Sequence, residues 1–432
     1  MTIMTDAELM LGLSRHLSVY QMGTERAALE QLEFAGWVLD VAFRLRGSTT
    51  SSAARVRAIG LDVGLGQRSL KDVISTMESL GWVSVVRDAD NVPISVSESI
   101  PASGDLVASA PQLLNLLMVG AAERAALAIL RATTLQPLLV EDVLHAATMA
   151  VGVDGNGEAA EAALRHLTFL GLVRRVVADD GRDVLYNPNV WTQGDGIAQA
   201  ALKAADARAT GEVTALLEEL ASNPGMPEAH VKSTEPKWVA FAVSQGLVQR
   251  SVIQTSEGLE QGFLFTPHLG RDPFGSSAGD ASGQVRQLVG SMIYAATFAR
   301  FKLTSPDVFL QALINRGVAG DVSSIGTDYP MLEKAGVVKV VAGSSSRRFR
   351  LELLQSDVAE DALKLLSTRE GSNGSGVSAA DAAALRAQRS YIHVERERAR
   401  LALTTDTDEA EQARLLAALR EVPVQRMMGG RS

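Results

Sequence analysis

LRHLTFLGLVRRVVADDGRDVLYN (residues 164–187) sets the architecture of this chain, because a helix end, a glycine and two β-rich runs follow one another within it. The helix ends at Gly171, and glycine adopts the left-handed backbone conformation that terminates helices at little cost. The β-rich part is interrupted by Asp179, Asp180 and Gly181, residues that favour a tight turn. The stretch therefore predicts a helix, a sharp turn and a two-stranded hairpin.

The same order of features recurs three more times along the chain. Gly81 and Gly246 are 165 residues apart, as are Gly171 and Gly336. One shared offset favours duplication of a two-unit segment over chance similarity between alanine- and valine-rich sequences. The further copies are MESLGWVSVVRDADNVPISVS (77–97), VAFAVSQGLVQRSVIQTSEGLEQGFLFT (239–266) and YPMLEKAGVVKVVAGSSSRRFRLEL (329–353).

Helix, glycine turn and hairpin together resemble the last third of a winged-helix domain, with the hairpin as the wing. The resemblance to the winged-helix superfamily covers roughly residues 35–365 at the level of fold pattern. It implies an α+β fold, mainly α with small β-hairpins, built from four winged-helix-like modules arranged as a duplicated pair. The predicted boundaries are 1–34 for an N-terminal helical segment, then 35–103, 104–192, 193–272 and 273–366 for modules 1 to 4.

Two segments after the third hairpin differ in composition from the modules. Residues 271–284 and 367–378 are rich in glycine and serine and lack apolar periodicity, which indicates flexible linkers. Residues 379–432 consist largely of strong helix formers, so we expect a C-terminal helical arm there. The arm carries arginines for which a solvated helix with internal ion pairs is the default interpretation, and docking of a partner, a second copy or a phosphate is the alternative. They are Arg386, Arg389, Arg396, Arg398 and Arg400.

The composition excludes several classes of function. The chain has no cysteine, which rules out disulfides, thiolate zinc sites, iron–sulfur clusters and cysteine nucleophiles. Its six histidines are scattered without the spacing of a metal site. Gly60, Gly64 and Gly66 do not form a phosphate-binding loop and predict an inter-helix turn instead. We therefore expect no cofactor, no metal and no enzymatic activity.

The N-terminal sequence and the net charge bear on location and partners. The first residues lack a secretory signal, and no apolar stretch is long enough for a bilayer span, so we expect a cytoplasmic protein with no membrane partner. A protein that binds DNA there would be nucleoid-associated. The net charge of −9 repels a duplex at long range, so DNA binding would depend on local basic patches.

Basic residues near the predicted recognition helices and wings are the candidates for DNA contact, because Arg and Lys bind phosphates and base edges. They concentrate in modules 2 and 4, chiefly in the wings, where they either contact one duplex or keep exposed hairpins soluble. The candidates are Arg68, Lys71, Arg87, Arg165, His166, Arg174, Arg175, Arg182, Lys232, Lys237, Arg250, Lys339, Arg347, Arg348 and Arg350.

Two functions are therefore compatible with the sequence. The first is a non-enzymatic DNA-binding protein, regulatory or architectural, whose cationic wings in modules 2 and 4 contact phosphate. The second is an interaction scaffold of a larger complex, such as a chromosome-condensation or defence assembly, in which the same surfaces hold a protein. Fold pattern alone does not choose between them, and self-association through the arm is compatible with both.

Overall fold

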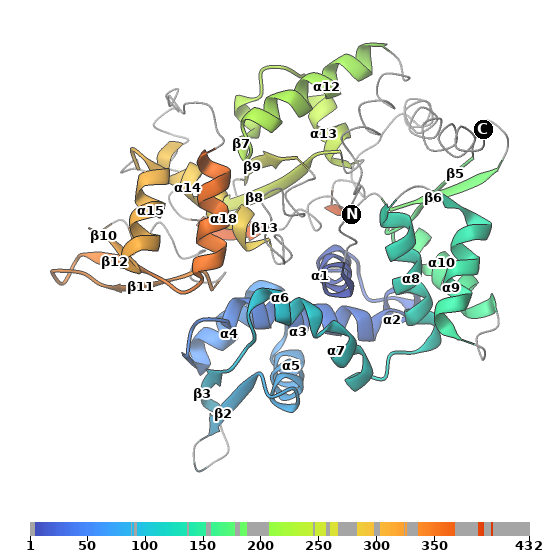
Figure 1. The fold of residues 1–432 in the computed structure, drawn as a ribbon, viewed down its shortest axis with the longest axis horizontal. Coiled ribbons are helices and arrows are strands. Elements are labelled where there is room, and N and C mark those ends of the chain that lie inside the picture. The colour runs from blue at the N-terminus through green and yellow to red at the C-terminus, as the bar shows by residue number, and fades with distance from the viewer. Residues whose placement is uncertain are drawn as a thin grey trace, which may run out of the picture.

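The protein is mainly helical with small antiparallel sheets, so the predicted α+β class is correct (Figure 1). Helix α1 (Asp6–Leu17) lies near the centre of the molecule, and four sheets with their helices surround it. None of the described helices is long and apolar enough to cross a membrane. The computed structural model describes residues 5–87, 89, 93–135, 138–152, 157–177, 182–187, 207–244, 247–255, 260–266, 283–297, 303–323, 325, 336–367, 388–392 and 399–400.

Unit 1 (residues 30–98) is a three-helix body with a three-stranded sheet in the order β1-β3-β2. The Ser52 hydroxyl accepts a hydrogen bond from the Arg55 amide at 3.3 Å and caps the helix that follows the first strand. At the predicted glycine turn, Gly81 has a φ of +73°. The elements are α3 (Glu30–Leu45), β1 (Thr50–Ser52), α4 (Ala53–Val63), α5 (Gln67–Ser79), β2 (Val83–Arg87) and β3 (Pro93–Glu98).

Unit 2 (residues 121–186) repeats this element order, and its sheet order β4-β6-β5 is equivalent. Gly171 has a φ of +67°, again where the helix before the hairpin ends. Units 1 and 2 share one hydrophobic core with α1. The elements are α8 (Ala121–Leu135), β4 (Leu138–Leu139), α9 (Val140–Val151), α10 (Gly157–Phe169), β5 (Arg174–Val177) and β6 (Asp183–Tyr186), with α6 (Ser103–Ala108) and α7 (Ala110–Leu116) as the connection from unit 1.

Unit 3 (residues 207–265) has a four-stranded sheet, because a strand from the predicted arm joins it. Residues 388–392 form β13 and pair antiparallel with β8, so the prediction of helix is wrong at these five residues. A free sheet edge offers unpaired backbone groups, and Tyr391 and Ile392 suit a strand. The unit's elements are α12 (Ala207–Ser222), β7 (Met226–Pro227), the 3₁₀ helix η1 (Glu228–His230), α13 (Pro236–Ser244), β8 (Gln249–Thr255) and β9 (Glu260–Phe265).

Unit 4 (residues 284–353) departs from unit 2 in one strand. The third strand of its sheet, β10, follows α15, whereas β4 precedes α9. The hairpins and the two described helices nevertheless keep the 165-residue offset to within three residues. The elements are α14 (Gln284–Thr297), α15 (Pro306–Arg316), β10 (Val318–Val322), β11 (Val338–Ala342) and β12 (Phe349–Leu353), followed by α18 (Ser356–Ser367).

Helix α14 joins three units, since every residue from Gln284 to Ala295 is buried. The Gln284 side-chain amide donates to the Phe43 carbonyl of α3 at 3.1 Å. On the same helix, the Arg286 guanidinium donates to the side-chain oxygen of Gln249 in β8. A buried polar side chain is stable only when such partners are present. This helix therefore fixes units 1, 3 and 4 relative to one another.

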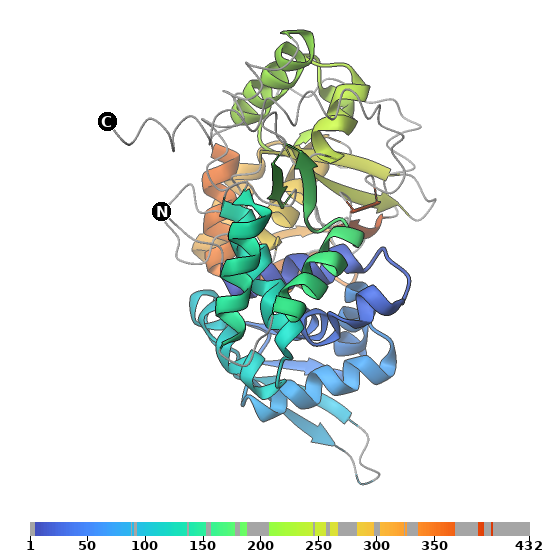
Figure 2. The same ribbon diagram turned by 90° about the vertical axis from the view of Figure 1, so that its right-hand side faces the viewer.

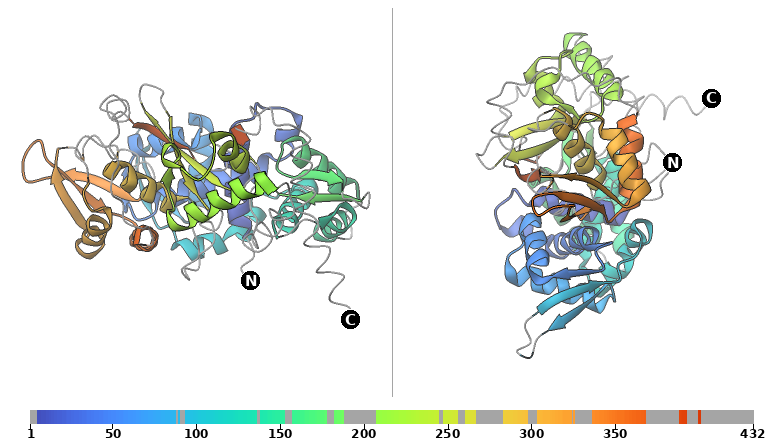
Figure 3. Two further views of the ribbon diagram at one scale, coloured as in Figure 1. Left: turned by 90° about the horizontal axis from the view of Figure 1, so that it is seen from above. Right: turned by 90° about the vertical axis from the view of Figure 1, so that its left-hand side faces the viewer.

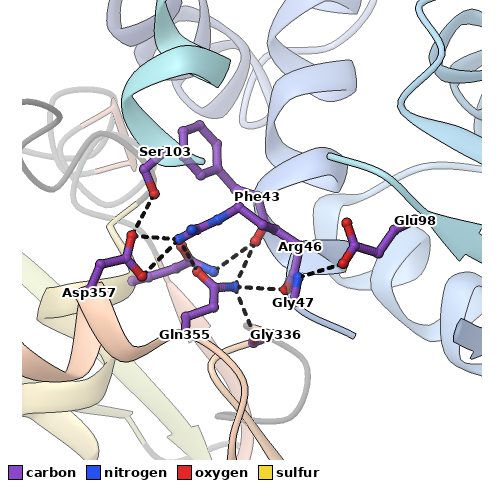
Figure 4. Close-up of polar contacts among 9 residues, drawn as sticks. Phe43, Arg46, Gly47, Glu98, Ser103, Gly336, Gln355 and Asp357 are labelled. Atoms are coloured by element: carbon purple, nitrogen blue, oxygen red, sulfur yellow. Dashed lines mark hydrogen bonds and ion pairs between the residues drawn. The ribbon is translucent and has the colours of Figure 1, made fainter. Parts of the chain in front are cut away.

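The C-terminal end of α3 is held by unit 4 (Figure 4). The Gln355 side-chain amide donates to the Phe43 and Gly336 carbonyls, each at 2.9 Å. Phe43 lies in the last turn of α3, where carbonyls have no partner within the helix. Gly336 has a φ of +74°, and a Cβ at this position would overlap the Arg44 carbonyl group. Only glycine permits this close approach.

An ion pair completes the same junction (Figure 4). The Arg46 guanidinium donates to the Asp357 carboxylate at 2.9 Å and to the side-chain oxygen of Gln355 at 2.7 Å. The Ser103 hydroxyl of α6 also donates to Asp357, at 2.9 Å. Arg46, directly after α3, thus meets residues of α6 and α18, and the segment that follows unit 4 is docked on unit 1 by specific polar contacts as well as by packing.

A buried charge cluster fixes α1, α3 and α4. Asp40 accepts from Arg15 at 3.3 Å and from Arg44 at 2.9 Å, and Arg44 also pairs with Asp62. Burial lowers the pKa of Arg44, but the carboxylates of Asp40 and Asp62 outweigh it and raise that pKa. Arg44 therefore stays charged, and the members of the cluster depend on one another because an unpaired buried charge is costly.

The hairpins point away from this centre in different directions. The β11–β12 hairpin and the β5–β6 hairpin lie at opposite ends of the longest axis of the molecule (Figures 1 and 3). The β2–β3 hairpin projects from a third side (Figure 2). A straight duplex could therefore contact the second and fourth hairpins together only by running along the length of the protein.

Candidate interaction groove and cationic surfaces

A groove of about 570 Å³ lies in unit 1 between α4, α5 and the β2–β3 hairpin, and we call it the unit 1 groove. Val56, Ile74 and Val96 form its buried floor, and Leu70 and Val85 are partly buried beside them. Leu70 and Ile74 are one helical turn apart on α5, while Val85 and Val96 are direct cross-strand neighbours. The floor is therefore a continuous apolar surface.

The rim of the unit 1 groove is polar and mainly cationic. Arg57 on α4 and Lys71 on α5 are both exposed, and neither forms an ion pair within the part of the chain that the structure describes. Gln67 and Ser75 add uncharged polar groups on α5. Carboxylates approaching this rim would therefore find two cations that no neighbouring side chain neutralises.

The one carboxylate in the lining, Glu78, is occupied by its neighbours. It accepts from the Arg87 guanidinium at 2.8 Å and from the Val85 amide at 3.3 Å. The hydrogen bond from Arg87 and, less strongly, that from the Val85 amide lower the pKa of Glu78, and the same pair raises the pKa of Arg87. Arg87 and Glu78 thus cancel in charge, and the pair ties the end of α5 to β2.

Arg68 lies beside this groove without lining it. Its side chain is exposed on α5, three residues before Lys71. The sequence prediction treated Arg68, Lys71 and Arg87 as equivalent DNA contacts. In the structure Lys71 and Arg87 line the groove and Arg68 does not.

In unit 2 the predicted contacts do not form a uniform cationic wing. Arg175 pairs with Asp183 on the neighbouring strand, and this hydrogen bond raises the pKa of Arg175 and lowers that of Asp183. Arg165 and Arg182 are exposed, on α10 and at the start of the second strand. The remaining two candidates, His166 and Arg174, are half-buried.

Unit 3 holds two of its three predicted contacts in ion pairs. Arg250 pairs with Glu228 at 2.7 Å and is largely buried. Lys237 pairs with Glu235 at 3.1 Å, and its ammonium lies 5.5 Å from the centre of the Trp238 ring. Lys232 is exposed. The glycine predicted to start this hairpin, Gly246, lies outside the described residues.

In unit 4 the wing arginines surround an aspartate of β10. The Asp321 carboxylate lies 3.6 Å from the Arg348 guanidinium and 3.7 Å from the Arg350 guanidinium. It also accepts from the Ser344 hydroxyl and amide, and these hydrogen bonds, followed by the two arginines, lower its pKa to about 2. Arg347 is exposed at the hairpin turn.

The fourth predicted contact of that hairpin, Lys339, is exposed on β11 directly opposite Glu352 of β12. Carboxylates thus stand among the basic residues of this wing as they do in the other units. Glu228 and Asp321 were not identified from the sequence, because they lie far along the chain from the arginines they contact. Only the folded sheets bring them together.

Of the predicted interaction arm, the structure describes residues 388–392 and 399–400. Arg389 lies on β13, the strand that pairs with β8, and Arg400 is exposed and has helical backbone. Arg386, Arg396 and Arg398 lie outside the described residues. Among the residues that are described, no group of three or more histidines and carboxylates could hold a metal ion.

Two comparisons with known proteins gave no match from which a function could be inferred. No protein-family model matches the chain, and no curated protein matches it.

Proposed function

We propose that this chain is a non-enzymatic interaction scaffold, whose units present binding surfaces for protein partners around a fixed centre. One observation carries the proposal: in every unit, carboxylates of the same unit engage basic residues that would otherwise contact phosphate. The basic residues held in this way are Arg87, Arg175, Lys237, Arg250, Arg348 and Arg350.

These ion pairs favour protein over DNA because phosphate binding requires cations that are free to replace counterions. A cation already paired with a carboxylate contributes less, since the carboxylate repels the incoming phosphate. The net charge of −9 acts in the same direction. Protein partners tolerate such surfaces, because a polar rim around an apolar centre is the usual composition of an interface.

The proposal includes the winged-helix character of the units. In units 1 and 2 this character is supported by the order of elements, which is helix, strand, two helices and hairpin. The first strand of each unit pairs with the last strand of its hairpin. Units 3 and 4 are proposed as divergent copies of units 1 and 2. Unit 3 has η1 in place of a helix, and in unit 4 the strand β10 comes after a helix and not before it. A cytoplasmic location is part of the same proposal.

The scaffold is tested by photo-crosslinking in the native host. Single large apolar side chains are exposed on several elements and tolerate replacement by the apolar residue p-benzoylphenylalanine. We expect light-dependent adducts with discrete proteins, or with a second copy of the chain, from a subset of positions. Adducts with DNA alone would refute the proposal. The positions are Leu61, Met118, Met149, Phe169 and Val308.

DNA binding is the second candidate, and the exposed face of α5 favours it. Gln67, Arg68, Lys71 and Ser75 share that face, and such side chains can donate to phosphates or base edges. Changing Arg68 and Lys71 together to glutamate would then abolish duplex binding. Changing Arg347, Arg348 and Arg350 to glutamine tests the wing in the same way, and duplex binding unaltered by both changes would show that neither α5 nor this wing contacts DNA.

A further inference from the structure

We propose that the unit 1 groove binds an acidic amphipathic segment of a partner protein, with apolar side chains on the floor and carboxylates at the rim. This inference rests on the proposed scaffold function and specifies the chemistry of one partner. It concerns α4, α5 and the β2–β3 hairpin, all of which lie within unit 1.

The floor determines that the occupant is apolar on one side. Val56, Ile74 and Val96 are buried at the bottom of the groove, and the exposed parts of Leu70 and Val85 continue the same surface. Nucleic acid would place charged phosphates or sugars over these side chains and leave them without apolar contact. Leucine or isoleucine side chains spaced along one face of a peptide would instead remove this surface from water.

The rim determines that the occupant is acidic. Arg57 and Lys71 approach the groove from two different helices, so carboxylates on either flank of a bound segment can reach a cation. Glu78 does not oppose them, because Arg87 and the Val85 amide already use its oxygens. Like charges at a rim disfavour the wrong partner more strongly than opposite charges favour the right one, so a basic segment should be rejected.

The experiment uses the full chain and three fluorescein-labelled peptides of about 16 residues. The first has leucines on one helical face and glutamates elsewhere, the second replaces the glutamates with lysines, and the third replaces the leucines with serines. In fluorescence anisotropy we expect the first to bind with a Kd of roughly 1–100 μM. The other two should bind at least about tenfold more weakly.

Two charge reversals on the same helix localise the site. Lys71→Glu, at the rim, should weaken the acidic peptide about tenfold, whereas Arg68→Glu, outside the groove, should change its Kd by less than about threefold. Ser75→Lys adds a cation to the rim and should tighten binding by about threefold. A gain in affinity cannot come from misfolding, so this variant remains decisive if another one is unstable.

Several results would overturn the inference. These are no binding of the acidic peptide, equal binding of the acidic and basic peptides, equal effects of Lys71→Glu and Arg68→Glu, or displacement of the peptide by a DNA duplex. Failure here is distinguishable from failure of the scaffold itself, because crosslinks to proteins from Met149, Phe169 or Val308 do not depend on the unit 1 groove.

Discussion

Replacing Gly336 with alanine should break the junction between unit 4 and α3. Its φ of +74° is a conformation that alanine adopts only at a cost of about 1–2 kcal/mol. An added Cβ would lie 2.6 Å from the Arg44 carbonyl carbon and closer still to the carbonyl oxygen. Both partners are backbone groups, so neither can move aside alone.

The matched control is Gly81→Ala. Gly81 occupies the equivalent turn in unit 1, has nearly the same φ of +73°, and has open space where a Cβ would be added. This variant therefore suffers only the conformational cost of about 1–2 kcal/mol. Gly336→Ala suffers that cost and about 1–3 kcal/mol from overpacking, so we expect a total of roughly 2–5 kcal/mol.

Urea unfolding followed by circular dichroism compares the two variants, and hydrogen exchange locates the change. Gly336→Ala should lower the unfolding midpoint more than Gly81→Ala does. It should also accelerate exchange in the last turn of α3, which lies across the junction, whereas Gly81→Ala should affect only the start of β2. Equal midpoints, or unchanged exchange in α3, would refute the described contact between Gly336 and Arg44.

Three further substitutions test other contacts. Gln355→Glu should lower the free energy of unfolding by roughly 2–4 kcal/mol at pH 7, since the Phe43 and Gly336 carbonyls lose a donor. The loss should be smaller at pH 4, where the introduced carboxyl is protonated and can donate. An equal loss of unfolding free energy at pH 4 and pH 7 would contradict this explanation. Asp40→Asn should cost about 3–5 kcal/mol in urea unfolding, because buried arginine charge loses its partner. A cost below about 1 kcal/mol would show that the cluster is dispensable. The pKa of Asp321 is lowered from 3.8 to about 2, so its contribution to stability is complete above pH 3.8 and is lost as the pH falls toward 2. A carboxyl NMR titration with a midpoint near 3.8 would disprove this, and Asp321→Asn should abolish that part of the pH dependence of thermal unfolding.

The sequence predicted the local features that a few neighbouring residues determine. Gly81, Gly171 and Gly336 all have the positive φ expected of helix-terminating glycines. A β-hairpin follows each of these turns, as the alternation of β-rich runs and polar turns predicted. Gly64 ends α4 in the left-handed conformation and Gly66 precedes α5, which confirms an inter-helix turn there, whereas Gly60 lies within α4. Such features depend on backbone conformation within one or two turns of chain.

The features that the sequence did not predict depend on contacts between distant segments. The place of β10 is set by its pairing with β12, and β13 exists because β8 offers a free edge. Neither strand has a local sequence signal that specifies its pairing partner. The strong helix formers within 379–432 therefore gave the wrong secondary structure for β13.

The cationic surfaces show the same limit. Counting arginines identified the wings of modules 2 and 4 as basic. The count did not reveal that Asp321 lies within 4 Å of Arg348 and Arg350. The unit 1 groove was also missed, because its floor combines residues from α4, α5 and two strands. Arg57 carried no signal in the sequence, since it precedes the predicted recognition helix.

Titration of a labelled random duplex with the full chain most directly separates a scaffold from a DNA-binding protein. At roughly 200 mM salt we expect no saturable change in anisotropy up to about 10 μM protein, because carboxylates pair with Arg87, Arg175, Arg348 and Arg350 in the hairpins and the net charge is negative. Saturable binding with a Kd below about 1 μM, weakening steeply between roughly 50 and 200 mM salt, would contradict the proposed scaffold function.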